Sequence, residues 1–560
     1  MENNGDLDLN CHATGDVRLD TAIYQWIKWD KGMYKYLARS FPDFSSRGIV
    51  VGYDTRAQEA SGCNSERLAR LTAAVMLCKD IPVFLFSTYV PTPFVPYAVK
   101  RLGAAAGVMV TASHNPKEDN GYKVYWHNGA QISSPNDKEI LKCIEESSEP
   151  WSESWNESLA DNSPLRSDPL REISKKYMED LSSVCFHREL NTKSPLKFVH
   201  SSFHGVGHDY VQQAFRAFGF PPPIPVPEQK DPDPNFSTVS CPNPEEGESV
   251  LELSLRLAER ENATIVMATD PDADRLAVAE QSDRCGWKVF TGNELAALLG
   301  WWMLFNWKET HSDPADRERM YMLATTVSSK ILKAFARIEG FHFEETLPGF
   351  KWIGKKIHEL AKTGNEVIFA FEESIGFLCG SMVPDKDGVS AAVVVAEMAS
   401  YLYNKNLTLN QQLENIFEIY GYHISTTSYV ICHDPPTVKR IFTRLRNFEG
   451  ENTYPRSSGG HSIVDVRDVT TGYDSSQPDK LCVLPMTKSS EMITFTLQNG
   501  IVATLRTSGT EPKIKFYTEF CARPGKSDIS SLEEELKKVT DTLVEEFLEP
   551  DKNNLIRRSI

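Results

Sequence analysis

Short apolar strands alternate with helical segments along most of this chain, and this alternation restricts the possible folds more than any other feature. Residues 49–51, 107–110 and 264–268 are apolar runs of strand length. Segments with apolar residues at helical spacing separate them. Strands that alternate with helices in this way are typical of mostly parallel sheets covered by helices on both faces.

The last part of the chain follows a different pattern. Residues 492–497 and 501–505 alternate around Asn499-Gly500, which is the strongest short hairpin signal, and an apolar stripe at helical spacing closes the chain. The fold class is therefore expected to be α/β, with three successive mixed α/β sheet domains and a C-terminal α+β domain. The expected boundaries are 1–182, 183–291, 292–418 and 419–560.

Charge and composition exclude several classes of function. The net charge of −17, from 60 basic and 77 acidic residues, argues against nucleic-acid or anionic-membrane binding, which depend on basic surface. The N-terminus lacks the pattern of a signal peptide, and no apolar run is long enough to cross a bilayer. The 11 cysteines are isolated, which predicts reduced thiols in the cytosol. Nothing argues for an oligomer, so a monomer is expected.

Ser113 lies in a loop directly after the strand 107–110, with His114 beside it. A serine at a strand end next to an imidazole is a candidate nucleophile, although a polar turn halted by Pro116 is the alternative. Lys123 follows soon after Ser113 in the sequence and is expected to lie near it. This lysine and three further loops of similar design favour the functional interpretation.

Asp270, Asp272 and Asp274 follow the strand 264–268. In an extended loop, carboxylates at every second position fall on one side, where they repel unless a cation binds. Oxygen ligands suit Mg²⁺ or Ca²⁺. An EF-hand would need glycine and glutamate where this chain has Arg275 and Gln281. The pattern predicts a Mg²⁺ site with room for a phosphate oxygen.

Two further loops carry groups that could bind a sugar phosphate. Glu372 and Ser374 would present a carboxylate and a hydroxyl to sugar hydroxyls if the chain stays extended, and a helix N-cap at Ser374 is the alternative. A later segment combines hydroxyls, a glycine and two cations, which is typical of a phosphate cradle, with a plain β-turn as the alternative. Its residues are Arg506, Thr507, Ser508, Gly509, Thr510 and Lys513.

Two smaller signals remain open. The loop with Thr346 and Gly349 is either a substrate loop or an ordinary turn. Asp54 and Arg56 are interpreted as an ion pair rather than a site.

Taken in this order, the motifs resemble the α-D-phosphohexomutase superfamily, and most of all its phosphoglucomutase-2 branch. Thr111 to Pro116 is a highly specific match to the phosphoserine loop of the superfamily. Residues 270–275 match its metal loop, 372–376 its sugar loop and 506–513 its phosphate loop.

The resemblance implies four domains around a central cleft. Ser113 would be phosphorylated, and Mg²⁺ would be held by Asp270, Asp272, Asp274 and the phosphoserine. His114 and Lys123 would assist proton movement and charge neutralisation. The residues implied to contact the substrate are Arg275, Thr346, Gly349, Glu372, Ser374 and those of the 506–513 loop.

The resemblance also implies a reaction. Phosphate would pass from 1,3-bisphosphoglycerate through Ser113 to glucose 1-phosphate or another hexose monophosphate, releasing glucose 1,6-bisphosphate, with weak mutase activity beside it. The alternative is a phosphopentomutase or phosphoglucomutase, which keeps the bisphosphate and reorients it.

One departure from the superfamily supports a third possibility, a non-catalytic sugar-phosphate-binding protein. The superfamily carries a Gly-Thr-(Ala/Ser)-Gly-Leu-Arg motif near its N-terminus, and this chain has none. Lys31 runs directly into Gly32, as if a block of dozens of residues were absent. That block would carry one strand of the first sheet and one arginine of the site.

Overall fold

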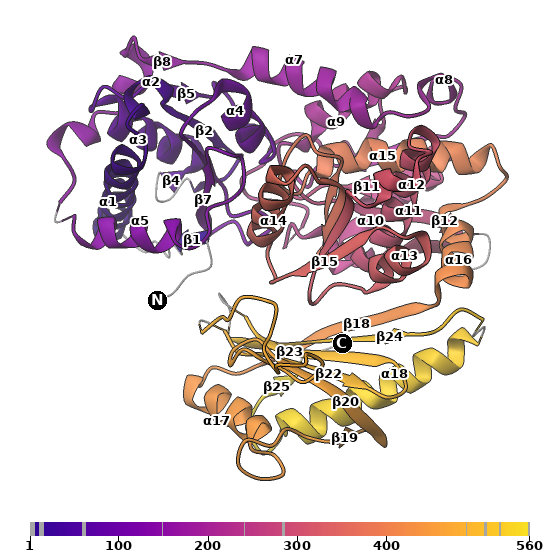
Figure 1. Cartoon of the computed structure of the whole chain (residues 1–560). Helices are drawn as coiled ribbons and strands as arrows, with labels where there is room; N and C mark the ends of the chain where they lie inside the picture. Colours follow the sequence, from indigo (N-terminus) through magenta and orange to yellow (C-terminus); the bar gives the residue numbers. More distant parts are fainter. Residues whose placement is uncertain are drawn as a thin grey trace. The chain divides into compact units, whose positions relative to one another are not determined.

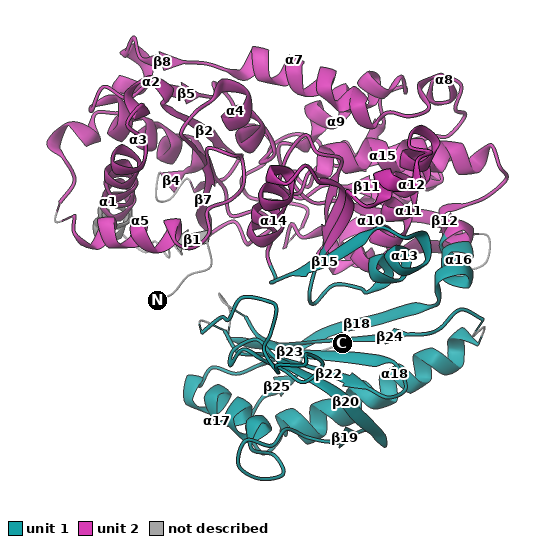
Figure 2. Cartoon of the chain, viewed as in Figure 1, with its two compact units in different colours: residues 1–4, 324–348, 413–560 teal, residues 5–323, 349–412 magenta. Residues whose placement is uncertain are grey.

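The computed structural model describes residues 6–9, 16–58, 63–147, 149–239, 241–282, 286–488, 490–508, 512–525 and 528–557. The chain divides into two compact units (Figure 2). The larger unit comprises residues 5–323 and 349–412, and the smaller comprises residues 1–4, 324–348 and 413–560.

The first sheet of the larger unit has six strands in the order β1-β7-β6-β2-β5-β8. Strands β1, β7, β2, β5 and β8 of this sheet are labelled in Figure 1. Strands β6, β2, β5 and β8 are parallel to one another, whereas β7 is antiparallel to β6 and β1 to β7. The prediction of a mostly parallel sheet is therefore confirmed, with an antiparallel edge. The strands are β1 (Asp6–Leu9), β2 (Ile49–Tyr53), β5 (Val83–Leu85), β6 (Ala106–Val110), β7 (Asn120–Trp126) and β8 (Arg166–Ser167).

Helices cover this sheet because their apolar faces match its buried strands. Trp26 on the first helix and Leu68 and Leu71 on the third are part of the same hydrophobic core as Val51 and Val108. The fourth helix approaches the sheet at its glycines, since a methyl group at Gly52 or Gly107 would overlap side chains of that helix. The helices are α1 (Asp16–Ser40), α3 (Ser65–Leu77), α4 (Phe94–Leu102), α5 (Asn136–Glu145) and α7 (Leu170–Asp180).

The second sheet repeats the α/β design in the order β10-β9-β11-β12-β13. Its strands β10, β9 and β11 are parallel, and β12 and β13 continue as an antiparallel extension. The loop between β11 and β12 carries the three aspartates. The elements are β9 (Phe198–Ser201), β10 (Ile224–Pro225), β11 (Ile265–Ala268), β12 (Ala277–Ser282), β13 (Gly286–Val289), α9 (Gly207–Phe218) and α10 (Glu248–Glu261).

A third set of strands and helices completes the larger unit. Its strands β16 and β17 form an antiparallel hairpin, in which β16 ends at Glu372 and β17 begins at Gly376. The first helix of this set, α11, begins with a capping box, in which Glu294 N donates to Thr291 Oγ1 and Thr291 N donates to Glu294 Oε2. The elements are α11 (Gly292–Thr310), α14 (Phe350–Lys362), β16 (Glu366–Glu372), β17 (Gly376–Cys379) and α15 (Gly388–Tyr403). Two further elements, β14 (Met320–Thr325) and α16 (Leu409–Tyr420), begin in the larger unit and end in the smaller one.

The smaller unit is built on a largely antiparallel sheet in the order β19-β20-β22-β23-β24-β18-β25. The predicted hairpin at Asn499-Gly500 is confirmed, with Gly500 at φ +99°. The predicted stripe is buried from Leu532 to Leu543. The main elements are α13 (Ile331–Glu339), β15 (His342–Thr346), β18 (His423–Ile431), α17 (Pro435–Arg446), β20 (His461–Asp468), β22 (Met492–Leu497), β23 (Ile501–Thr507), β24 (Lys513–Cys521) and α18 (Ile529–Leu543).

These observations confirm the predicted fold class of successive mixed α/β sheets followed by a C-terminal α+β part. Within the described ranges, no helix combines the length and the apolar character needed to cross a membrane.

Candidate functional site

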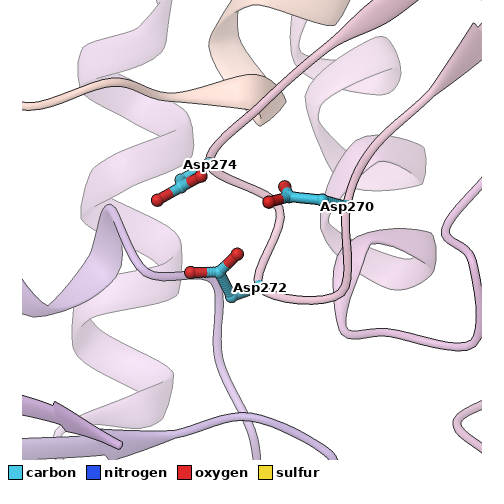
Figure 3. A group of neighbouring side chains, drawn as sticks. All are labelled: Asp270, Asp272 and Asp274. Atoms are coloured by element: carbon cyan, nitrogen blue, oxygen red, sulfur yellow. The ribbon is translucent and has the colours of Figure 1, made fainter. Parts of the chain in front are cut away.

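Three buried aspartates meet in the loop between β11 and β12 (Figure 3). Asp270, Asp272 and Asp274 are fully buried, and one carboxylate oxygen from each lies within 4.8 Å of the other two. The predicted convergence is confirmed, but the predicted extended backbone is not found. The loop turns instead, because Ala273 adopts φ +56° and its N–H donates to the carbonyl of Asp270 at 2.9 Å. The turn brings together side chains that an extended loop would space further apart.

The charge of this cluster is partly balanced by Lys123 on β7. Its Nζ lies 2.8 Å from Asp272 Oδ2 and 2.9 Å from Asp274 Oδ2. Burial alone would raise the pKa of Asp272, but the ammonium of Lys123 outweighs burial and holds that pKa below its ordinary value. Burial raises the pKa of Asp270 well above its ordinary value, and the charges of Asp272 and Asp274 add to this effect.

The cluster fits a hard divalent cation. The Oδ1 atoms of Asp272 and Asp274 are buried and accept no hydrogen bond from any residue in the described part of the chain. A buried carboxylate oxygen without a partner is destabilising, and a cation bound among the three carboxylates would satisfy both atoms. Carboxylate oxygens are the ligands that Mg²⁺ and Ca²⁺ prefer.

Ser113 reaches this cluster from the neighbouring sheet. It follows β6, and its Oγ donates a hydrogen bond to Asp270 Oδ2 at 3.0 Å. Its backbone lies in the left-handed region, with φ +52°, which is uncommon for any residue except glycine. The Thr111 hydroxyl accepts the N–H of Ser113 at 2.9 Å and so supports this conformation. The structure therefore places a serine hydroxyl directly at the acidic cluster.

His114 lies beside the serine, with its Nδ1 3.4 Å from Ser113 Oγ. Burial lowers the pKa of His114 well below its ordinary value, and the positive charge of Arg275 lowers it further. The imidazole is therefore neutral at neutral pH, and a neutral imidazole can accept a proton.

Arg275 closes the aspartate loop. Its N–H donates to Asp270 Oδ1 at 3.0 Å, and its Nε lies 3.8 Å from Asp270 Oδ2 and 3.9 Å from Asp274 Oδ1. Burial alone would lower the pKa of Arg275, but the two aspartates outweigh burial and raise it. The guanidinium stays charged and is available to an anionic ligand.

Glu372 is held at the site by a lysine, while Ser374 takes part through its backbone. The chain turns into the β16–β17 hairpin after Glu372, with Ile375 at φ +52°. Because the chain turns, the prediction that Glu372 and Ser374 share one face of an extended segment is not met, and no helix begins at Ser374. The carbonyl of Ser374 accepts a hydrogen bond from Arg275 Nη1 at 3.3 Å.

Lys386 is the site residue that sequence reasoning missed. Its Nζ lies 3.3 Å from Glu372 Oε1 and 3.7 Å from Asp274 Oδ2. Burial alone would lower its pKa, but these two carboxylates outweigh burial and raise it. Burial would likewise raise the pKa of Glu372, but Lys386 and Arg275 hold that pKa below its ordinary value. The available signal was the Asp-Lys-Asp-Gly sequence directly before α15, in a loop after a hairpin.

Two residues expected in a substrate loop lie at element ends. Thr346 is the buried last residue of β15, in the smaller unit, and its Oγ1 donates to the carbonyl of Leu347 at 3.0 Å. Gly349 precedes α14 in the larger unit and adopts φ +103°, a conformation that favours glycine.

The predicted phosphate cradle joins β23 to β24 in the smaller unit. Arg506 and Thr507 end β23, and the Thr507 hydroxyl accepts the N–H of Glu491 at 2.9 Å. Ser508 N donates to the carbonyl of Lys513 at 2.9 Å. The Lys513 ammonium lies 4.3 Å from the centre of the Tyr429 ring. Gly509 and Thr510 lie outside the described residues.

Comparison with known proteins finds three family domains along the chain. The descriptions "Phosphoglucomutase/phosphomannomutase, alpha/beta/alpha domain I", "domain II" and "domain III" match residues 22–151, 175–284 and 291–420. The chain is 64% identical to human glucose 1,6-bisphosphate synthase, with 99% of each chain covered. It is 57% identical to mouse phosphopentomutase, covering 94% of this chain and 85% of the mouse protein.

Solved structures show the same fold at much lower identity. Parafusin, a phosphoglucomutase from Paramecium in its open form, has a TM-score of 0.70 at 16% identity, with 96% of this chain and 93% of parafusin covered. A phosphoglucomutase/phosphomannomutase family protein from Burkholderia thailandensis has a TM-score of 0.65 at 17% identity, with 97% of each chain covered.

The alignment with the human synthase also contains a gap. It spans 616 positions, which exceeds the 560 residues of this chain by 56, while 99% of this chain is aligned. At least 56 positions of the relative therefore have no counterpart within the aligned part of this chain. With the remaining sequence matched at this identity, the chain belongs to the phosphoglucomutase/phosphomannomutase family, within the α-D-phosphohexomutase superfamily.

Proposed function

We propose that this protein transfers a phosphoryl group through Ser113 and forms glucose 1,6-bisphosphate from a hexose monophosphate. One observation carries the proposal: Ser113 Oγ donates a hydrogen bond at 3.0 Å into a buried cluster of three aspartates. The 64% identity to a glucose 1,6-bisphosphate synthase supports the choice of product. The proposed phosphate donor is 1,3-bisphosphoglycerate.

In the proposed first step, Ser113 Oγ attacks the donor phosphorus as the bond to the leaving oxygen breaks. The neutral imidazole of His114, with Nδ1 3.4 Å from Ser113 Oγ, accepts the hydroxyl proton. In the second step a sugar hydroxyl attacks the phosphorus of the phosphoserine as the bond from phosphorus to Ser113 Oγ breaks. His114 returns its proton to Ser113 Oγ, and the proton of the sugar hydroxyl is released to solvent. The Lys123 and Arg275 cations balance negative charge on the transferred group.

Asp270, Asp272 and Asp274 are proposed to hold Mg²⁺ together with the phosphoserine. A bound Mg²⁺ would supply positive charge to the phosphoryl oxygens. Glu372 is proposed to accept hydrogen bonds from sugar hydroxyls, since Lys386 holds its pKa down and keeps it ionised. Ser374, Thr346 and Gly349 are proposed to contact the sugar phosphate.

The loop 506–513 is proposed to bind the phosphate that is not transferred. Arg506 and Lys513 flank hydroxyls and a glycine in this segment, which is the composition of a phosphate cradle.

We propose that the alignment gap falls between Lys31 and Gly32. In this chain α1 runs unbroken through that point, and it buries Asp30 completely in an apolar core. Carboxylates are rarely buried in an apolar core. This unusual burial fits a helix in which the residues before and after the proposed gap are not adjacent in the relatives. The absent residues would carry a strand and an arginine of the site, so activity below that of the relatives is expected.

The protein is proposed to act as a monomer in the cytosol. This proposal rests on the isolated cysteines of the sequence, of which Cys78, Cys143, Cys185, Cys379, Cys432, Cys482 and Cys521 are free thiols, as is typical of proteins in a reducing compartment.

The decisive experiment incubates purified protein and Mg²⁺ with glucose 1-phosphate, with and without 1,3-bisphosphoglycerate. Net glucose 1,6-bisphosphate that depends on the donor supports the synthase. Isomerisation of glucose 1-phosphate or ribose 1-phosphate, without net bisphosphate, would support the second candidate, a mutase, which the 57% identity to a phosphopentomutase favours. Sugar-phosphate binding without phosphate on Ser113 would indicate a non-catalytic protein.

A further inference from the structure

The phosphoserine loop must be held in a conformation that its own sequence does not favour. Ser113 lies at φ +52°, a region that non-glycine residues rarely adopt. The direction of its Oγ toward Asp270 depends on this backbone conformation. Some part of the surrounding structure must therefore stabilise the loop against relaxation.

The buried guanidinium of Arg56 donates hydrogen bonds to backbone carbonyls of this loop. Arg56 Nη2 donates to the carbonyls of Ser113 at 2.6 Å and Asn115 at 2.7 Å. Its Nη1 donates to the carbonyls of Pro116 at 2.7 Å and Asp119 at 3.3 Å. The side chain of Arg56 thus binds four backbone carbonyls within the seven residues 113–119, and the first of these carbonyls belongs to Ser113, the candidate nucleophile.

Arg56 is itself fixed by a buried network. Its Nε lies 3.2 Å from Asp54 Oδ2, and both side chains are almost completely inaccessible, which confirms the predicted ion pair. Asp54 Oδ1 also accepts the Arg56 N–H at 3.0 Å and the Ser65 hydroxyl at 2.5 Å. Asn120 Nδ2 donates to Ser65 Oγ at 3.1 Å. Since Asn120 begins β7, the network ties the far end of the loop to the same aspartate.

The strand order explains why Arg56 can act on this loop. β2 and β6 are parallel neighbours, so their carboxyl ends lie side by side, and Asp54 N donates to the carbonyl of Val110 at 3.1 Å. This arrangement needs a guanidinium, because its planar set of N–H donors can donate hydrogen bonds to four carbonyls at once. A lysine ammonium has three donors and cannot reproduce this arrangement.

We propose that Arg56 is a positioning residue that sets the direction of Ser113 Oγ, and that it does so through the backbone carbonyls of residues 113–119. This inference rests on the proposed phosphoryl transfer through Ser113. Asp54 forms an ion pair with Arg56, and the proposed effect of Arg56 on the nucleophile is one of orientation.

The test uses the full chain and measures transfer of phosphate from 1,3-bisphosphoglycerate to Ser113 by intact mass in single turnover. Arg56→Lys and Arg56→Ala are expected to slow phosphorylation by about 100-fold, because misplacing a reacting group by about 1 Å has that effect. Mg²⁺ affinity by calorimetry should change by less than about twofold, since Lys123 and Thr92 hold the aspartates independently. Added guanidinium ion should restore part of the rate in Arg56→Ala.

Arg47→Lys is the matched control. Arg47 also donates to backbone carbonyls of the same unit, at 2.8 Å from Nε to Gly103 O and 3.0 Å from Nη2 to Ala104 O. Its substitution should leave phosphorylation of Ser113 within about twofold of the native rate. If Arg56 variants fail to fold, Ser65→Ala removes only the hydroxyl that supports Asp54, and it should slow phosphorylation with Mg²⁺ affinity retained.

The outcomes separate this inference from the function on which it rests. Native protein that never acquires phosphate on Ser113 contradicts the proposed function. Native protein that is phosphorylated, together with an Arg56→Lys variant phosphorylated at the same rate, overturns the role of Arg56. Loss of phosphorylation, Mg²⁺ affinity and thermal stability in proportion, without rescue by guanidinium, also overturns it, because that pattern describes a merely structural residue.

Discussion

The ammonium of Lys123 lies 2.8 Å from Asp272 Oδ2, inside the cluster that fits a divalent cation. Lys123→Met would remove a positive charge that competes with the metal, so Mg²⁺ affinity should rise by about tenfold, or ~1.4 kcal/mol. The metal-free variant should melt at a lower temperature, because the buried carboxylates of Asp272 and Asp274 lose a partner. Calorimetric titration with Mg²⁺ and melting curves with and without EDTA measure both effects.

Lys100→Met is the control for that substitution. Lys100 is a lysine of the same unit whose Nζ donates to the carbonyl of Met382 at 3.4 Å. Its variant should show native Mg²⁺ affinity. Weaker binding in Lys123→Met would contradict the expected competition.

Ser113→Ala should abolish phosphate incorporation, because the hydroxyl that would carry the phosphate is gone. Mg²⁺ binding should become weaker but remain measurable, since Asp270, Asp272 and Asp274 are intact. Intact mass after incubation with 1,3-bisphosphoglycerate and calorimetry with Mg²⁺ give the two readouts. Ser46→Ala, at an exposed serine, is the control, and normal turnover in Ser113→Ala would refute the nucleophile.

Asp30 should make the stability of the first α/β region depend on pH. Burial raises the pKa of Asp30 from 3.8 to about 8, against the lowering effect of hydrogen bonds from Tyr122 and Thr72. The folded state therefore binds the proton more tightly than the unfolded state. The stabilisation is complete below about pH 4 and is lost as pH rises through about 8, by several kcal/mol in total.

Asp30→Asn removes that ionisation. Hydrogen-exchange protection of α1 should fall between about pH 5 and pH 8 in the native protein, after correction for intrinsic exchange rates, and should stay nearly constant in the variant. Glu139→Gln, at an exposed carboxylate on α5, is the control. Equal pH dependence in all three proteins would show that Asp30 is not the titrating group.

Glu345 should stabilise the smaller unit through two ion pairs. Its carboxylate lies 2.9 Å from Lys330 Nζ and 2.9 Å from Arg467 Nη1. Burial alone would raise the pKa of Glu345, but the two cations outweigh burial and lower it to about 2. The stabilisation is therefore present above the ordinary glutamate pKa and is lost as pH falls through about 2.

Glu345→Gln removes the carboxylate that pairs with Lys330 and Arg467. At neutral pH this substitution should lower the free energy of unfolding of the smaller unit by about 2 kcal/mol. Urea unfolding followed by hydrogen exchange of β15 and β20 measures the loss. Glu533→Gln, at an exposed position of α18, should cost less than about 0.5 kcal/mol. A loss in Glu345→Gln no larger than that in the control would contradict the role of the ion pairs.

Sequence patterns were sufficient for most of the secondary structure. The strand 107–110, the strand 264–268 and the hairpin at Asn499-Gly500 were all predicted close to their observed bounds. The acidic loop after β11 was predicted to gather its carboxylates, and it does. These features depend on residues near one another in the chain, so periodicity and turn chemistry are enough to identify them.

Local conformation at the site was less predictable. The aspartate loop and the segment after Glu372 were expected to be extended, yet both turn, with Ala273 and Ile375 at positive φ. Neither residue type favours that conformation by itself. Contacts made by the surrounding elements impose it, and these contacts are absent from any local pattern.

The sequence by itself therefore determined the elements, the fold class and the residue types that carry the chemistry. Only the tertiary structure decided which of them meet: Lys386 beside Glu372 and Asp274, Arg56 beneath Ser113, and Ser113 against Asp270. The last pair is separated by 157 positions. Such partners depend on strand order and on how one sheet packs against the next, and no periodicity within a segment encodes either.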